Sequence, residues 1–225
     1  MVLGVIMERK ISVPLYAGAL IISLVIFIIG IFVGQIIDAS NLQTISEDLS
    51  HVSQKVASIN LLLLMEDNSS SFCPVYMEQL QSIDQEIEIV GHKLTYLEEE
   101  KNIYDSELKK DYFVQEAESY LLSKKAKQLC NDSSILLVYF YSNVDCASCQ
   151  DQGIEILKAR DELLGKGITV KIYSFDGDMG SSVAESLMTQ YNIVSYPSIV
   201  VNGAVYSGYK DSNAVSSIIQ SMVSE

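Results

Sequence analysis

The chain has 225 residues, a formal net charge of -14 and a mean hydropathy of +0.22. This length allows one ordinary domain with an attached segment, or two small domains, and it excludes a large multidomain enzyme. The acidity argues against nucleic acid as a partner, because like charges would repel. A positive mean hydropathy in so acidic a chain indicates that apolar and charged residues are concentrated in different segments.

The apolar residues are concentrated near the N-terminus. Residues 11–37 form an uncharged run rich in Ile, Leu, Val and Phe, whereas the residues after it carry 28 acids and 13 bases. A helix that spans a bilayer needs about 20 apolar residues, so this run predicts a transmembrane helix. A cleaved signal peptide fits less well, since its apolar region is usually about 7–15 residues long.

The basic residues predict an orientation for this helix. Arg9 and Lys10 precede the apolar run, and the nearest basic residue after it is Lys55. This asymmetry favours a cytoplasmic N-terminus over residues 1–10. We therefore expect a single-pass protein of the cell membrane, in contact with the lipid bilayer, whose C-terminal domain lies outside the cytoplasm.

A helical stalk is predicted over residues 38–66. Its apolar residues recur at alternating steps of three and four, which places a narrow seam on one side of a helix. The seam consists of Leu42, Ile45, Leu49, Val52, Val56 and Ile59. Such a coiled-coil pattern predicts a partner helix, either in a second copy of the chain as a homodimer or in the next helix of the same chain.

Residues 74–130 predict either a helical hairpin or one long helix. A second apolar seam changes phase near Asn102, which is also the midpoint between Cys73 and Cys130. A hairpin that folds back at Asn102 would bring both thiols to the same end, whereas a straight helix would separate them. Since a disulfide needs Cα atoms about 4.4–6.8 Å apart, we predict a hairpin closed by a structural disulfide between these cysteines. Two unlinked thiols are the alternative.

The last part of the chain, residues 134–225, has a different pattern. Short β-branched and aromatic runs alternate with amphipathic segments and glycine-containing turns. Strands are expected at 135–142, 168–174, 199–201 and 204–207, and helices at 149–164, 182–191 and 213–223. The sequence therefore predicts an α/β domain with the order β-α-β-α-β-β-α.

One motif in this domain carries chemistry. Cys146-Ala147-Ser148-Cys149 follows the first strand and opens the first helix, and Tyr196-Pro197 precedes a strand hairpin that turns at Asn202-Gly203. This combination resembles the thioredoxin-like superfamily over residues 134–225. The resemblance implies a thioredoxin-like fold in which Cys146 is the exposed attacking thiol and Cys149 is the resolving thiol. It also implies that Tyr196-Pro197 forms a cis peptide that faces the cysteines and binds substrate.

Physical chemistry supports the role of Cys146 independently. The thiolate is the reactive species, and the amides at a helix N-terminus stabilise negative charge there. Several residues depart from the family pattern. Asp145 stands where a Trp is common, and the first strand lacks the buried acid that serves thioredoxins proper as a proton acceptor. Ala147-Ser148 matches neither the reductants nor the strong oxidants of the family, so oxidation, reduction and isomerisation all remain open.

Other candidate sites are weaker. The CxxC motif could form half of a zinc site, but Cys73 and Cys130 would have to complete the tetrahedron and neither belongs to a second CxxC. Asp176 and Asp178 flank a glycine as in a fragment of a calcium loop, yet no bidentate acid completes the pattern, so we expect a turn. We expect no metal and no cofactor.

The leading hypothesis is a membrane-tethered thiol-disulfide oxidoreductase that acts on protein cysteines outside the cytoplasm. It would form a mixed disulfide on Cys146 that Cys149 resolves, with protein thiols or disulfides as substrates and a membrane redox partner. The alternative is a non-catalytic thioredoxin-like scaffold in which the cysteines form structural disulfides.

Overall fold

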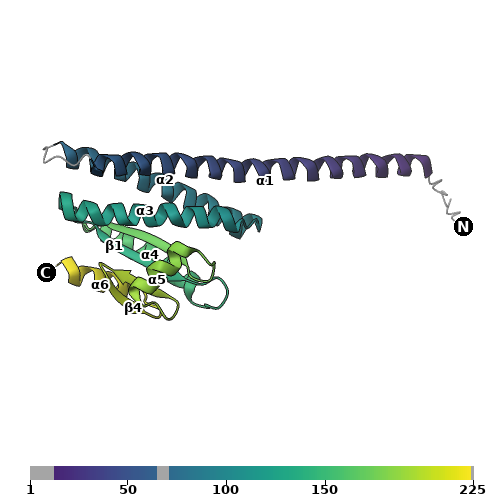
Figure 1. The fold of residues 1–225 in the computed structure, drawn as a ribbon. Coiled ribbons are helices and arrows are strands. Elements are labelled where there is room, and N and C mark those ends of the chain that lie inside the picture. Colours follow the sequence, from purple (N-terminus) through teal and green to yellow (C-terminus); the bar gives the residue numbers. More distant parts are fainter. Residues whose placement is uncertain (1–12, 65–70, 224–225) are drawn as a thin grey trace, which may run out of the picture. The chain divides into compact units, whose positions relative to one another are not determined.

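A computed structural model describes residues 13–64 and 71–223. The chain divides into two compact units, Met1–Thr44 and Ile45–Glu225, and the boundary falls inside the first helix, α1 (Val13–Leu64). Figure 1 shows the elements of both units in chain order. The predicted cytoplasmic segment 1–10 lies outside the described residues.

The structure corrects the membrane assignment. Within the described ranges, no helix combines the length and the apolar character that crossing a bilayer requires. The predicted transmembrane helix over 11–37 is therefore wrong. The same finding overturns the single-pass cell-membrane location derived from it.

The predicted seam of the stalk is buried within the chain. In the second unit, Val52, Val56 and Ile59 pack in one hydrophobic cluster with residues of α2 (Phe72–Lys101). A salt bridge of 2.6 Å between Lys93 and Asp48 joins the same two helices. Of the two partners that the seam predicted, the structure shows the next helix of the same chain.

The helices α2 and α3 (Ser106–Cys130) form a hairpin. The residue that ends α2, Asn102, adopts a left-handed conformation with φ of 53°, which a helix cannot continue. Asp105 then caps α3, because its carboxylate accepts hydrogen bonds from the amides of Glu107 and Leu108. At the open end, Cys73 and Cys130 are joined by a disulfide with Cα atoms 5.4 Å apart. Of the two predictions for residues 74–130, the structure therefore contains the hairpin and not one long helix.

The remaining elements follow the order β-α-β-α-β-β-α. The strands are β1 (Ile135–Tyr141), β2 (Val170–Asp176), β3 (Ser198–Val201) and β4 (Ala204–Ser207). The helices are α4 (Cys149–Leu164), α5 (Ser182–Tyr191) and α6 (Ser212–Val223). The strands form one sheet in the order β2-β1-β3-β4, in which β2 runs parallel to β1 and the other pairs are antiparallel.

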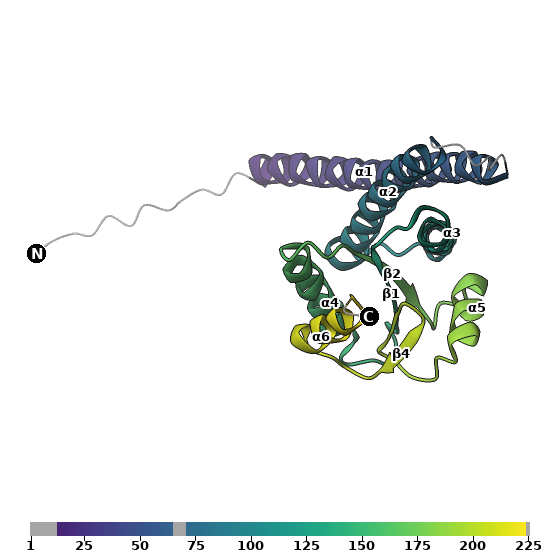
Figure 2. The ribbon, with the colours of Figure 1, turned by 90° about the vertical axis from the view of Figure 1, so that its left-hand side faces the viewer.

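Alternate residues of β1 face two different hydrophobic layers, as expected for a strand buried on both faces. Helices α4 and α6 cover one face, and α5 lies on the other (Figure 2). Helix α3 shares that second face with α5, because Phe113, Ala117 and Tyr120 pack against the even-numbered residues of β1. The predicted boundary near residue 134 therefore divides two segments that share a hydrophobic core.

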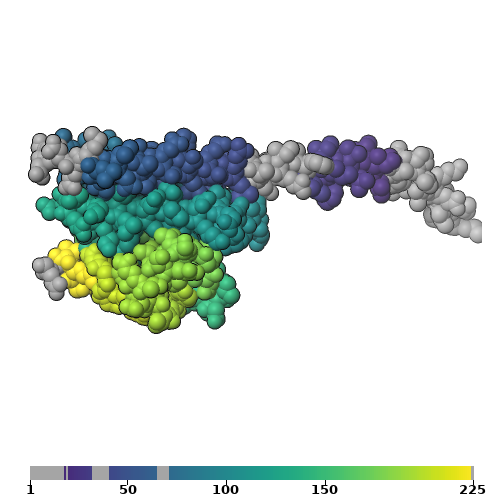
Figure 3. Space-filling model, in the orientation of Figure 1, coloured from purple at the N-terminus to yellow at the C-terminus, as the bar shows by residue number. Residues whose placement is uncertain are grey.

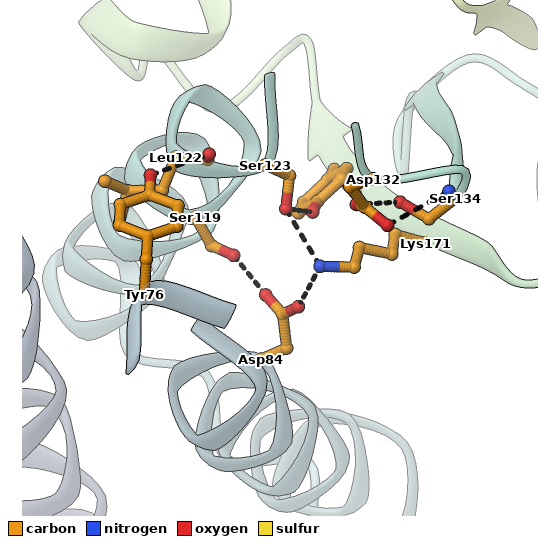
Figure 4. A network of polar contacts seen from close by, with 9 residues as sticks. Tyr76, Asp84, Ser119, Leu122, Ser123, Asp132, Ser134 and Lys171 are labelled. Carbon is orange, nitrogen blue, oxygen red and sulfur yellow. Dashed lines mark hydrogen bonds and ion pairs between the residues drawn. The ribbon is translucent and has the colours of Figure 1, made fainter. Parts of the chain in front are cut away.

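A polar network also ties the hairpin to β2 (Figure 4). Asp84 of α2 accepts a hydrogen bond from Ser119 of α3 and forms a 2.7 Å ion pair with Lys171 of β2. Ser123 accepts hydrogen bonds from Lys171 at 3.2 Å and from Tyr173 at 2.8 Å. In Figure 3, the teal surface of α3 lies directly against the green surface of residues that follow α3 in the sequence. Both apolar and polar contacts therefore hold the hairpin on the sheet.

Replacing both Cys73 and Cys130 by Ser should lower the free energy of unfolding by about 2–4 kcal/mol, because the cross-link restricts the unfolded chain. Urea denaturation of the oxidised protein measures this change. Cys146→Ser/Cys149→Ser is the matched control, and it should lose less because its disulfide closes a loop with a sequence separation of only 3. If the control lost more free energy of unfolding than the Cys73→Ser/Cys130→Ser variant, the hairpin disulfide would not be the one that stabilises the protein more.

Candidate functional site

The CxxC motif lies where β1 ends and α4 begins. Cys146 and Cys149 are joined by a disulfide with Cα atoms 5.4 Å apart, and Cys149 is the first residue of α4. Cys149 is only 5% exposed, whereas Cys146 is partly exposed. An attacking thiolate from another molecule can therefore reach Cys146 more readily than Cys149.

The loop between β1 and the motif is braced by the turn that follows β2. Ser142 accepts a hydrogen bond from the amide of Asp145 at 3.0 Å, and its hydroxyl donates to the carboxylate of Asp178. Asn143 donates to Asp176 at 2.9 Å. Asp176 and Asp178, the pair that resembled a calcium loop, thus lie at a turn, as expected. Their hydrogen bonds hold the loop that carries Cys146.

The start of α4 is anchored from two sides. The hydroxyl of Tyr139 donates to the carbonyl oxygen of Cys149 at 2.6 Å. Gln152 is fully buried and exchanges two hydrogen bonds with the main chain of Lys210, at 3.0 and 2.7 Å. These bonds fix the N-terminus of α4, where Cys149 lies.

The peptide bond between Tyr196 and Pro197 is cis. Ser198, which follows it, pairs with Phe140 of β1, so Pro197 lies at the same end of the sheet as the CxxC loop. The Tyr196 ring packs so closely on Gly177 that a Cβ atom there would lie 1.9 Å from the hydroxyl. Only glycine fits at this position without displacing the ring. The turn at Gly177 therefore contacts both the cis-proline loop and the CxxC loop.

Residues 135–223 resemble a thioredoxin-like fold. The resemblance consists of the sheet order, the CxxC at the strand-to-helix junction and the cis Tyr196-Pro197 peptide. No protein-family model matches the chain, and no curated protein matches it.

Several solved structures show a partial likeness to this chain. Human ERp44 is 21% identical over 46% of this chain and 32% of its own, with a TM-score of 0.34. The first thioredoxin domain of mouse protein disulfide-isomerase A4 is 17% identical over 44% of this chain and 71% of its own, with a TM-score of 0.33. Full-length ERdj5 is 12% identical over 45% of this chain and 15% of its own, with a TM-score of 0.31. The chain thus matches about a third of the length of ERp44.

A buried acid near this thioredoxin-like site was missed by the sequence analysis. Glu116 of α3 is 3% exposed, and its Oε1 atom accepts a 2.6 Å hydrogen bond from the amide of Ser174 in β2. Its Oε2 atom has no hydrogen-bond partner within the described parts of the chain. Burial raises the pKa of this carboxyl to about 8, although the Ser174 amide, the nearby Tyr112 hydroxyl and the Lys109 charge act to lower it.

A local signal for the burial of Glu116 exists in the sequence. Glu116 lies three residues after Phe113 and four before Tyr120, on the side of α3 that packs against the sheet. The first strand contains no acid, so Glu116 is an acid that the helical hairpin supplies to the surroundings of the motif. Glu116, Cys146 and Cys149 line the same groove, which has a volume of about 880 Å³.

The structure does not gather the four cysteines at one site. Cys130 precedes β1 and the CxxC motif follows it, so the two disulfides lie toward opposite ends of a seven-residue strand, roughly 23 Å long. A zinc site built from all four thiols is therefore not formed. The two pairs are separate covalent features.

Glu116→Gln should remove a pH dependence from the stability of the protein. In the unfolded chain this acid ionises near its usual pKa of 4.5, whereas the folded protein keeps its proton up to about 8. Unfolding therefore releases a proton between these values, and stability falls as pH rises through this window. Glutamine keeps the hydrogen bond from Ser174 without a charge.

We expect the melting temperature of Glu116→Gln to equal that of the wild type near pH 4 and to exceed it by at least about 5 °C at pH 8.5. Thermal denaturation followed by circular dichroism measures both values. The control is Glu107→Gln, whose side chain is 81% exposed on the same helix. An equal rise in the control, or a variant less stable than wild type at pH 8.5, would show that burial of Glu116 does not carry the effect.

Proposed function

We propose that this protein is a thiol-disulfide oxidoreductase that acts on protein cysteines through Cys146 and Cys149. The main support is the position of the disulfide at the start of α4, where Cys146 is the more exposed of the two cysteines. The cis Tyr196-Pro197 peptide at the same end of the sheet adds to this support.

The chemistry balances as two successive thiol-disulfide exchanges. A substrate thiolate attacks Sγ of Cys146, a mixed disulfide forms, and the bond to Cys149 breaks with release of the Cys149 thiolate. A second substrate thiolate then attacks the substrate sulfur of the mixed disulfide and releases the Cys146 thiolate. The substrate loses two electrons and gains a disulfide, and the protein pair is reduced. In the reverse direction, Cys146 attacks a substrate disulfide and Cys149 resolves the intermediate.

The helix N-terminus favours the required thiolate. Amides at the first turn of α4 carry partial positive charge, which stabilises an anion on a neighbouring sulfur. Asp145 precedes Cys146 and opposes this effect with its negative charge. The balance between the α4 amides and the charge of Asp145 sets how strongly the reduced form is stabilised. It therefore sets which direction of thiol-disulfide exchange the protein favours.

The surface around the motif suits a polypeptide substrate. Val144 and Val194 are 84% and 90% exposed, and they precede the CxxC motif and the cis peptide respectively. Exposed apolar side chains that precede the CxxC motif and the cis peptide provide contacts for the apolar residues of an unfolded chain.

The Cys73–Cys130 bond favours a structural role for that pair, because it closes the open end of the hairpin. The scaffold alternative extends this role to Cys146 and Cys149. Catalytic activity distinguishes the two functions.

Cys146→Ser should lower kcat/KM for oxidative refolding of a reduced protein by at least about 100-fold, because it removes the sulfur that forms the mixed disulfide. Cys149→Ser should instead accumulate a mixed disulfide with the substrate, visible by mass spectrometry. Cys73→Ser/Cys130→Ser is the control and should keep its activity at a temperature where it is folded. If Cys146→Ser catalysed refolding as fast as the wild type, the proposed oxidoreductase function would be rejected in favour of the non-catalytic scaffold.

A further inference from the structure

The strand β2 forms an open edge of the sheet beside the reactive disulfide. The amide of Ser174 points away from β1, since it donates to Glu116 of the hairpin. Main-chain groups alternate in direction along a strand, so those of Val170 and Ile172 point the same way. Neither residue's outward main-chain groups bond to any other residue that the structure describes. The edge is therefore capped at Ser174 and open at Ile172.

This edge forms one side of the groove of about 880 Å³ that also contains the cysteines. Helix α2 of the hairpin lines one wall and α4 the other. Cys146 lies at the start of α4, and Arg160 lies eleven residues after Cys149, roughly 16 Å along the helix. Arg160 reaches across to Glu88 of α2 in an ion pair of 3.3 Å. The groove therefore extends from the disulfide to a bridge between its two walls.

The lining of the groove suits an uncharged, extended segment. Ile154 and Leu157 of α4 are exposed apolar side chains within it. Six of its charged residues form three ion pairs, Asp84 with Lys171, Glu88 with Arg160 and Glu98 with Lys109. Glu99 and the buried Glu116 also line it. A length of roughly 16 Å accommodates about five residues of extended chain. Open strand edges commonly bind such segments by main-chain pairing.

We propose that this groove binds a segment of the protein substrate adjacent to its reacting cysteine, as an added strand that pairs with the main chain of Ile172. The inference rests on the proposed function, because the continuity of the groove with Cys146 identifies the occupant as a thiol-bearing polypeptide. It differs from substrate contact at the cis-proline loop, since Tyr196 and Pro197 do not line this groove. The hairpin, by supplying one wall, then takes part in substrate selection.

The direct test is amide hydrogen exchange in a covalent adduct. A ten-residue apolar peptide with one cysteine, activated as a mixed disulfide with thionitrobenzoate, is coupled to Cys146 of the Cys149→Ser variant. An activated peptide modifies any accessible thiol, so this measurement does not depend on turnover. We expect the exchange of the Ile172 amide to slow by at least about tenfold relative to the uncoupled variant. Unchanged exchange at Ile172 would overturn the proposal.

A second test separates peptide binding from the chemistry of the disulfide. Leu157→Trp fills the groove, and Leu164→Trp places the same ring on an exposed position of α4 outside it. Leu157→Trp should lower kcat/KM for the peptide at least about tenfold and leave exchange with oxidised glutathione unchanged, whereas Leu164→Trp should change neither rate. Equal peptide rates in the two variants would reject the groove. Failure of the wild type to turn over either substrate would count against the proposed function alone, because the amide hydrogen-exchange experiment does not require turnover.

Discussion

The central constraint in this protein is the burial of β1 on both faces and at both edges. All seven residues of the strand pair with β2 on one side, and residues 137–140 also pair with β3 on the other. Their side chains alternate between two helical layers. Such a strand cannot shift by one residue without exchanging its two faces. Its carboxyl end is therefore fixed, and with it the loop of Ser142, the CxxC motif and the start of α4. The pairing of Phe140 with Ser198 fixes the cis-proline loop at the same end.

The helical hairpin is part of this arrangement. Helix α3 forms one layer of the core beside α5, and Glu116 extends from it to cap the amide of Ser174 on the edge strand. Helix α2 adds the ion pairs of Asp84 and Glu88, which join it to β2 and α4. The disulfide between Cys73 and Cys130 holds the two helices together at their open end. The hairpin thus supports the domain that contains the CxxC motif, and it also borders the groove that Cys146 and Cys149 line.

Local patterns in the sequence predicted the elements but not their long-range contacts. The apolar run of β1, the helix opened by Cys149 and the turn at Asn202-Gly203 follow from periodicity and turn chemistry, and the structure has them in the predicted order. The left-handed Asn102 lies where the apolar seam changes phase, so the hairpin also follows from a local signal. In contrast, the hydrogen-bond partner of Glu116 is an amide 58 residues away, and the need for glycine at Gly177 depends on the ring of Tyr196. No local pattern contains such contacts. The uncharged run near the N-terminus predicted a membrane span that the described residues do not contain.

The two disulfides of this chain differ in their proposed roles, and a redox titration followed by mass spectrometry tests this difference most directly. The protein is equilibrated in thiol-disulfide buffers, alkylated, and mapped at each cysteine pair. We predict that Cys146–Cys149 is half reduced between about -120 and -270 mV, the range of thiol-disulfide oxidoreductases, and that Cys73–Cys130 stays oxidised as the potential is lowered to about -300 mV. If both pairs stayed oxidised down to about -300 mV, Cys146 and Cys149 would form a structural bond and the proposed catalysis would be wrong.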